Sequence, residues 1–235
     1  MKRLLAGLVL VASACGGGQP SLVVGVASSM TEAAQRLADA YGTHAIELSV
    51  AGSQVLVAQV REGAPLDIIL TADATTAATL TGLGVVQGEP QAFARNRLAI
   101  AVAEGNPLGI AGLGDLAGPG VTLVLAAPHV PAGRYTAELL DAAGITLSAS
   151  SLEPSVRAVL TKVQLGEADA GIVYRTDLAR PGITGIEIPH EINPITEYFA
   201  AALTTARDPV AASAFVAYLA TPAAQNILAE LGFSS

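Results

Sequence analysis

The chain has 235 residues, of which 51% are hydrophobic and only 14% are charged. This balance excludes an intrinsically disordered chain, which needs low hydrophobicity and a high density of charge. Acidic residues outnumber basic ones by 20 to 12, so the net charge of −8 repels phosphate backbones and we expect no nucleic-acid partner. One cysteine and three histidines exclude a disulfide framework and a Cys/His zinc cluster.

Residues 1–14 have the pattern of a secretory signal peptide. Lys2 and Arg3 form a positive region, and the apolar segment 4–14 is too short to remain in a bilayer as a spanning helix. Small residues precede Cys15, which resembles a bacterial lipobox, in which this cysteine is lipidated and becomes the mature N-terminus. Residues 15–21 would then be a lipidated cysteine and a flexible tether. An ordinary signal peptide cleaved near Ala14, with an incidental thiol, is the alternative.

The rest of the chain alternates short apolar runs with amphipathic helical patterns. In chain order we expect strand 22–27, helix 31–41, strand 46–50, helix 55–62, strand 67–70, helix 73–81, strands 96–103 and 121–126, helices 134–143 and 156–165, strands 170–174, 183–188 and 197–204, and helices 209–220 and 222–231. Continuous apolar strands between amphipathic helices indicate an α/β fold with mainly parallel sheets, covered by helices on both faces.

Two such blocks, joined by two long extended segments, predict two lobes and a hinge. We place the first lobe at 22–93 plus 199–235 and the second at 94–198. Ligands of these sheets bind outside the carboxyl ends of the strands, so the cleft between the lobes is the expected site.

Small hydroxyl and glycine residues follow the strands that would end at this cleft. Ser29 and Ser53 follow the first two strands, the segment 130–133 precedes one helix, and Ser155 precedes another. Four helix N-termini meeting there would offer free N–H groups and partial positive charge, an anion site without lysine or arginine. A single serine at a helix start is more often only a cap, so both interpretations stay open on spacing alone.

The same residues lie in segments that resemble one protein family in composition and order. These segments are Ala-Ser-Ser-Met-Thr-Glu-Ala at 27–33, Glu-Gly-Ala-Pro-Leu-Asp-Ile at 62–68 with Thr-Ala-Asp at 71–73, Ala-Arg-Asn-Arg-Leu at 94–98, Val-Pro-Ala-Gly-Arg-Tyr at 130–135, Gly-Glu-Ala-Asp-Ala-Gly-Ile-Val-Tyr at 166–174, Pro-Ala-Ala-Gln at 222–225 and Gly-Phe at 232–233. Over 22–233 the chain is similar to the molybdate-binding proteins of ATP-driven (ABC) importers. It departs from them at 127–129, which is one residue shorter, and at Gly52, where some relatives have serine.

The resemblance implies a two-lobed type II periplasmic-binding-protein fold with two hinge strands. Together with the lipobox pattern at Cys15, it implies an extracytoplasmic, lipid-anchored and monomeric protein. Such a protein captures molybdate, and also tungstate, and delivers it to the membrane permease subunits of the importer. Hydroxyl and amide groups would hold the oxyanion at positions that match the family's binding residues, namely Ser29, Ser53, Ala132, Val156 and Tyr174. No cofactor, catalytic residue or direct metal ligand is implied, because the metal is approached only through its oxygens.

The chemistry of this donor set agrees with a fully deprotonated tetrahedral dianion, whose oxygens only accept hydrogen bonds. No aspartate or glutamate is among the expected contacts, which disfavours phosphate, since phosphate keeps a proton near pH 7. Sulfate carries no proton either, so it must be rejected by its shorter bonds, whereas tungstate is nearly the size of molybdate. Sulfate, or another ligand in the same fold, remains the alternative.

A secreted hydrolase with Ser29 or Ser53 as nucleophile is the rival class. The sequence contains no G-x-S-x-G elbow, no G-x-x-x-x-G-K loop and no H-E-x-x-H motif. No histidine is placed by spacing beside either serine. We therefore expect a binding protein and no enzyme.

Overall fold

The structure is a computed structural model that describes residues 21–234. The signal peptide expected at 1–14 and the lipidation site expected at Cys15 therefore lie outside the described residues. The elements, in chain order, are β1 (Leu22–Ala27), the 3-10 helix η1 (Ser28–Met30), α1 (Thr31–Tyr41), β2 (Ile46–Ala51), α2 (Ser53–Arg61), β3 (Ile68–Thr71), α3 (Ala74–Gly82), β4 (Gln91–Asn96), β5 (Leu98–Ala103), η2 (Leu113–Ala117), β6 (Leu123–Ala126), α4 (Pro131–Ala143), β7 (Ser151–Glu153), α5 (Val156–Gln164), β8 (Ala170–Tyr174), η3 (Arg175–Ala179), β9 (Ile183–Glu187), β10 (Thr196–Ala202), α6 (Pro209–Tyr218) and α7 (Pro222–Glu230). In this part of the chain, none of the helices combines the length and apolar character that crossing a membrane requires.

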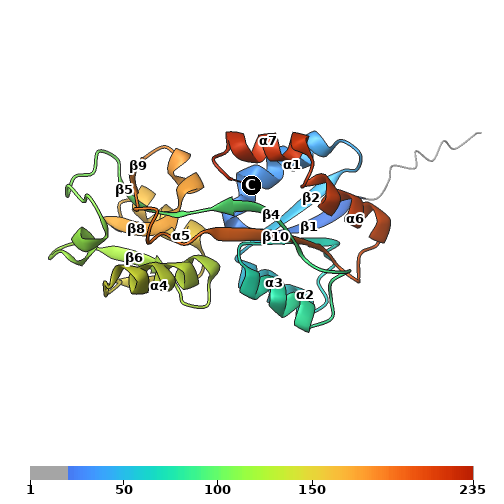
Figure 1. Ribbon diagram of the computed structural model, residues 1–235, viewed down its shortest axis with the longest axis horizontal. Coiled ribbons are helices and arrows are strands. Elements are labelled where there is room, and N and C mark those ends of the chain that lie inside the picture. Colours follow the sequence, from blue (N-terminus) through green and yellow to red (C-terminus); the bar gives the residue numbers. More distant parts are fainter. Residues whose placement is uncertain (1–20, 235) are drawn as a thin grey trace, which may run out of the picture.

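The strands form two five-stranded sheets, one in each of two lobes (Figure 1). The first has the order β2-β1-β3-β10-β4 and the second the order β7-β6-β8-β5-β9. In each sheet three neighbouring strands are parallel, and the fourth runs antiparallel to both of its neighbours. Helices cover both faces of the first sheet, and β4 and β10 lie along the connection between the lobes (Figure 1). The expected two-lobed α/β fold is confirmed.

The chain passes from the first sheet to the second at Arg97, and it returns between β9 and β10. The lobe boundaries expected at 93/94 and 198/199 fall inside β4 and β10, which both pair in the first sheet. The start predicted for the strand 96–103 is wrong, because Asn96 ends β4 and β5 begins only at Leu98. Only one residue separates these strands, so the sequence shows one run where the structure has two strands in different sheets.

Two strands escaped the sequence analysis, and two helices begin before the expected residue, α2 at Ser53 and α4 at Pro131. β4 mixes polar and exposed residues with buried ones, and β7 has only three residues, so neither shows a continuous apolar run. Helix α4 begins at Pro131 and not at Arg134. Proline suits the first position of a helix, where its missing N–H would have no intrahelical acceptor. The segment that precedes Arg134 is therefore a helix start.

Small and aliphatic side chains fill the cores, as the scarcity of aromatic residues predicts. In the first lobe, one cluster around Leu37 and Phe215 packs α1, α6 and α7 on one face of the sheet. A second cluster around Leu56 and Leu80 packs α2 and α3 on the opposite face. The second lobe has its own buried cluster, which includes Leu160. Each lobe thus holds its strand ends on a separate rigid support.

The start of α4 lies very close to the end of β6. A Cβ atom on Gly133 would be 2.1 Å from the carbonyl oxygen of Ala127 and 2.7 Å from that of Ala126. Because backbone atoms cannot move aside cheaply, only glycine allows this approach. The contact fixes the N-terminus of α4, including Ala132, beside the strand ends of the second lobe.

Asp67 is a buried carboxylate that connects three parts of the first lobe. It accepts hydrogen bonds from the backbone N–H groups of Val23, at 2.7 Å, and of Arg207, at 2.8 Å, and from the Arg207 guanidinium, at 2.7 Å. Burial alone would raise the pKa of Asp67, but these hydrogen bonds outweigh it and hold the pKa below its ordinary value. The carboxylate thereby joins β1 to the loop between β10 and α6.

We expect Gly133→Ala to lower the free energy of unfolding by about 1–3 kcal/mol, because the added methyl group overlaps two carbonyl oxygens. Gly82→Ala is the matched control, since a Cβ there has no neighbour within 4 Å. Urea unfolding of both variants and the wild type measures the difference. Equal stability of the two variants would show that the start of α4 relaxes without cost.

We expect Asp67→Asn to destabilise the protein at pH 7, and by less at pH 3. The folded-state pKa lies below the ordinary value of 3.8, so the carboxylate stabilises the fold above that pH. Its contribution is lost as the pH falls through the folded-state pKa. Urea unfolding of wild type and variant at both pH values tests this. A difference in unfolding free energy that is the same at pH 7 and pH 3 contradicts it.

Candidate functional site

A small pocket lies between the two lobes, at the carboxyl ends of several strands. Its empty space, with the open mouth included, is about 220 Å³. Both lobes line it, through Ala27, Ser28, Ser29, Gly52, Ser53 and Ala72 on one side and Val130, Pro131, Ala132, Ser155, Val156 and Tyr174 on the other. None of these twelve described residues has a charged side chain, so the pocket suits a small ligand held by neutral groups.

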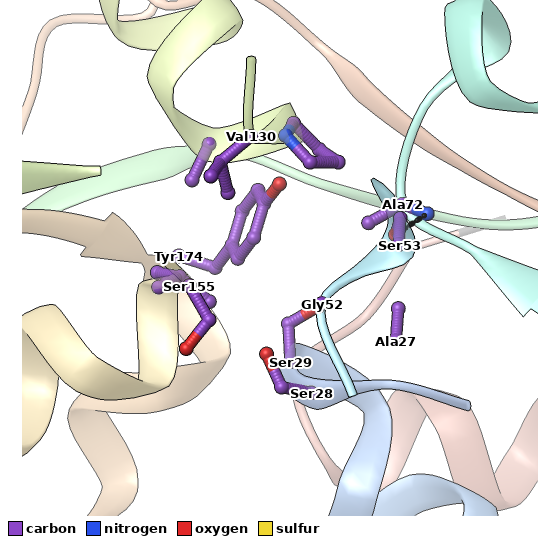
Figure 2. A pocket seen from close by; sticks show the side chains of 12 residues that line it. Ala27, Ser28, Ser29, Gly52, Ser53, Ala72, Val130, Ser155 and Tyr174 are labelled. Atoms are coloured by element: carbon purple, nitrogen blue, oxygen red, sulfur yellow. Dashed lines mark hydrogen bonds between the residues drawn. The ribbon is translucent and has the colours of Figure 1, made fainter. Parts of the chain in front are cut away.

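The structure brings all five residues that the sequence singled out to this one pocket. Figure 2 shows Tyr174, Ser155 and Val130 facing Ser29, Gly52 and Ser53 across it. The five residues Ser29, Ser53, Ala132, Val156 and Tyr174 are all buried, with at most 6% of their surface exposed. Sequence spacing alone did not place the two lobes against each other, and the structure supplies that placement.

Three helix N-termini supply the backbone donors of the pocket. Ser53 is the first residue of α2, Val156 is the first residue of α5, and Ala132 is the second residue of α4. Their N–H groups have no acceptor within their own helices. The helix dipoles add partial positive charge at the same ends, so the electrostatic potential favours an anion.

The two serine hydroxyls each receive a hydrogen bond from the protein. The N–H of Ala72 donates to Ser53 Oγ at 3.2 Å, and the hydroxyl of Tyr198 donates to Ser29 Oγ at 3.2 Å. Each serine oxygen already accepts from a protein donor, so its own hydrogen remains available to a ligand. Both side chains are therefore prepared as donors. Ser155 has a second task, because its Oγ accepts from the N–H of Ala158 and caps α5.

Among the residues that line the pocket, Tyr174 has a buried hydroxyl whose hydrogen-bonding capacity is unmet. It ends β8 and is only 1% exposed, and among the described residues its hydroxyl has no hydrogen-bond partner. Burial raises the pKa of Tyr174 well above its ordinary value, so the hydroxyl stays protonated and can donate. A buried hydroxyl without a partner costs about 1–3 kcal/mol, which a ligand with acceptor oxygens would recover.

The buried carboxyl group of Asp177 contacts the backbone of Tyr174. Asp177 accepts a hydrogen bond from the Tyr174 N–H at 3.2 Å and does not line the pocket. Burial raises the pKa of Asp177 to about 6, although Arg157 and Arg180 favour its charged form. Its contact with the backbone fixes the turn that presents the Tyr174 ring to the pocket.

Ion pairs join the lobes on both sides of the pocket. Arg134 of α4 donates to Asp73 and, at 3.0 Å, to Thr76 of the first lobe. On the other side, Arg157 and Arg180 both donate to Glu32 of α1. Burial would raise the pKa of Glu32, but the two arginines outweigh it and hold the pKa below its ordinary value. The structure thus shows the lobes in direct contact around the pocket.

Two more contacts across the cleft were not anticipated. Arg157 of α5 reaches the carbonyl of Ser28 in the other lobe at 3.2 Å. Gln54 donates to the carbonyl of Pro154 at 2.8 Å, and a Cβ on Gly52 would come within 2.8 Å of the Gln54 amide nitrogen. The glycine that departs from the family pattern therefore leaves room for this contact. The partners are 100 or more residues apart, so no sequence spacing could reveal them.

Residues 21–234 hold no group of three or more His, Cys, Asp or Glu side chains that could bind a metal ion directly. The pocket can offer hydroxyl and N–H donors from two lobes, and it offers neither a carboxylate nor an ammonium group. Chemically, this arrangement suits a small ligand whose surface consists of hydrogen-bond acceptors.

Comparison with known proteins agrees with the geometry. Residues 22–234 match the family described as bacterial extracellular solute-binding protein. The molybdate-binding protein ModA of Mycobacterium tuberculosis is 34% identical over 250 residues, which cover 98% of this chain and 94% of that protein. The molybdate-binding protein ModA of Escherichia coli is 30% identical over 259 residues, which cover 99% of this chain and 97% of that protein.

Solved structures show the same fold. The periplasmic molybdate-binding protein of Azotobacter vinelandii gives a TM-score of 0.78 at 21% identity, with 91% of this chain and 99% of that chain covered. The sulfate-binding protein SubI of Mycobacterium tuberculosis also gives 0.78, at 20% identity, with 91% and 86% covered. The chain therefore belongs to the bacterial extracellular solute-binding proteins and, within them, to the ModA family.

Proposed function

We propose that this protein captures molybdate outside the cytoplasm and delivers it to the membrane permease subunits of an ABC importer. The observation that carries the proposal is the buried Tyr174 hydroxyl, which has no partner among the described residues and lines an uncharged pocket. The similarity to ModA proteins over nearly the whole chain supports the same function. In this proposal the protein acts as a monomer and needs no cofactor.

Molybdate matches the donor set because its four oxygens only accept hydrogen bonds. The hydroxyls of Ser29, Ser53 and Tyr174 would meet it from both lobes, together with the N–H groups of Ala132 and Val156. A phosphate that keeps its proton needs an acceptor, and none of the lining side chains is a carboxylate. The donor set therefore favours a dianion without a proton.

Sulfate is the second candidate, since SubI, a sulfate-binding protein, shares the fold. Sulfate is also a dianion without a proton, so only size can separate it from molybdate. Its shorter bonds would leave longer hydrogen bonds to a rigid ring of donors, and hydrogen bonds weaken steeply with length. Tungstate is nearly as large as molybdate, so we propose that both ions bind.

Two further parts of the proposal concern delivery and location. The donors are neutral and divided between the lobes, so opening the cleft would separate them and free the ion without breaking a salt bridge to it. A lipid on Cys15 would hold the protein at the membrane that contains the importer, and a short tether would let it reach the permease.

Titration calorimetry with four oxyanions tests the function. We expect molybdate and tungstate to bind with similar affinity, sulfate to bind more weakly and phosphate to give no heat. At 100 times its Kd, molybdate should stabilise the protein by about 2.7 kcal/mol in unfolding experiments. Tighter binding of sulfate than of molybdate would assign the site to the second candidate.

Tyr174→Phe tests the residue that carries the proposal. Losing one hydrogen bond to a charged acceptor should cost about 1.5–3 kcal/mol, or about 10- to 150-fold in the Kd for molybdate. The unfolding free energy without ligand should be unchanged or higher, because a buried hydroxyl without a partner is removed. Tyr218→Phe is the matched control, since the buried Tyr218 hydroxyl also has no partner within residues 21–234 but lies outside the pocket. Equal affinities of both variants and the wild type would exclude Tyr174 as a ligand.

A further inference from the structure

Tyr198 lies just outside the pocket, on the strand that returns from the second lobe to the first. It is fully buried in β10 and does not line the pocket. Its hydroxyl oxygen is 3.2 Å from Ser29 Oγ and 3.5 Å from Nδ2 of Asn96, which ends β4. The hydroxyl therefore lies between the two connecting strands and a serine of the pocket.

The orientation of the Asn96 amide is fixed by its other contacts. Its Oδ1 accepts from the N–H of Arg97 at 2.9 Å, and its Nδ2 donates to Thr176 Oγ1 at 2.9 Å. The side of Asn96 that faces Tyr198 is therefore a donor, so Tyr198 must accept from it. The hydrogen of the Tyr198 hydroxyl is then directed to Ser29, the acceptor within reach.

The hydrogen bonds from Asn96 to Tyr198 and from Tyr198 to Ser29 determine that Ser29 acts as a donor to the pocket. Its oxygen accepts from Tyr198, so its own hydrogen is free for a ligand. The reverse direction would use up the Ser29 hydrogen on Tyr198 and turn lone pairs toward the pocket, which an anion would repel. Ser53 shows the same arrangement, but its donor is the backbone N–H of Ala72, which cannot reverse.

The Tyr198 ring is held on two sides. Phe233 packs edge-on against it with ring centres 5.4 Å apart, and Tyr174 lies tilted beside it at 5.9 Å. These contacts fix the ring without the hydroxyl, so the hydroxyl can be removed while the packing is kept. Burial also raises the pKa of Tyr198, which keeps its hydroxyl protonated.

We propose that Tyr198 is a positioning residue for oxyanion binding, whose hydroxyl donates to Ser29 and so commits Ser29 to donate to the ligand. The inference rests on the proposed function and deepens it. Tyr198 does not touch the ligand in this proposal, and its whole effect passes through the Ser29 hydroxyl.

A double-mutant cycle on the full chain, with molybdate as the probe in titration calorimetry, tests this role. We expect Tyr198→Phe to weaken binding about 3- to 10-fold, because Ser29 is no longer held as a donor. In the Ser29→Ala background, the same substitution should have no further effect. Tyr218→Phe is the control in both backgrounds and should leave the Kd unchanged. Urea unfolding without ligand checks that Tyr198→Phe folds like the wild type.

The outcomes separate this role from the function itself. Wild-type affinity in Tyr198→Phe, or an equal loss in the presence and absence of the Ser29 hydroxyl, overturns the positioning role and leaves the proposed function intact. A wild-type protein that binds none of molybdate, tungstate and sulfate overturns the proposed function, and the role of Tyr198 with it. If Tyr198→Phe weakens molybdate binding in the wild type but not in the Ser29→Ala background, the result supports both the proposed function and the positioning role.

Discussion

The structure depends on a local excess of hydrogen-bond donors over acceptors in one buried place. Hydroxyl and N–H groups from two lobes face a pocket in which none of the lining side chains is charged. A buried donor without a partner costs free energy, so acceptor oxygens from a ligand, or from water, stabilise such a pocket. The fold creates this condition by ending strands of both sheets at the cleft and starting helices there.

Neutral donors can hold an anion although the whole chain carries a charge of −8. Charges on the surface are screened over about 8 Å at physiological ionic strength, whereas donors in the pocket act at contact distance. The helix N-termini at Ser53, Ala132 and Val156 provide this short-range potential without adding a cation. A cation in the pocket would bind many anions tightly, while a ring of fixed dipoles discriminates by size and protonation.

Most of the fold could be predicted from the sequence, because its buried strands and amphipathic helices have clear periods. Strand 22–27, helix 31–41 and strand 170–174 have the expected bounds. The two missed strands share a physical cause, since neither β4 nor the three-residue β7 has a continuous apolar run.

Part of the site was also predictable, because strand ends are visible in the sequence. Ser29 and Ser53 follow apolar strands, and the family resemblance adds Ala132, Val156 and Tyr174. Tyr198 could not be found in this way, because its contact with Ser29 joins residues 169 positions apart through the packing of the lobes. Tertiary contacts of this kind leave no local pattern in a single sequence.

The ion pairs between the lobes are arranged with one sign of charge on each side. Arg134, Arg157 and Arg180 belong to the second lobe, whereas their carboxylate partners, Asp73 and Glu32, belong to the first. Moving the lobes apart would therefore expose a cationic wall opposite an anionic one. An oxyanion that entered such an open cleft would be drawn to the second lobe first, and closure would cancel the field that attracted it.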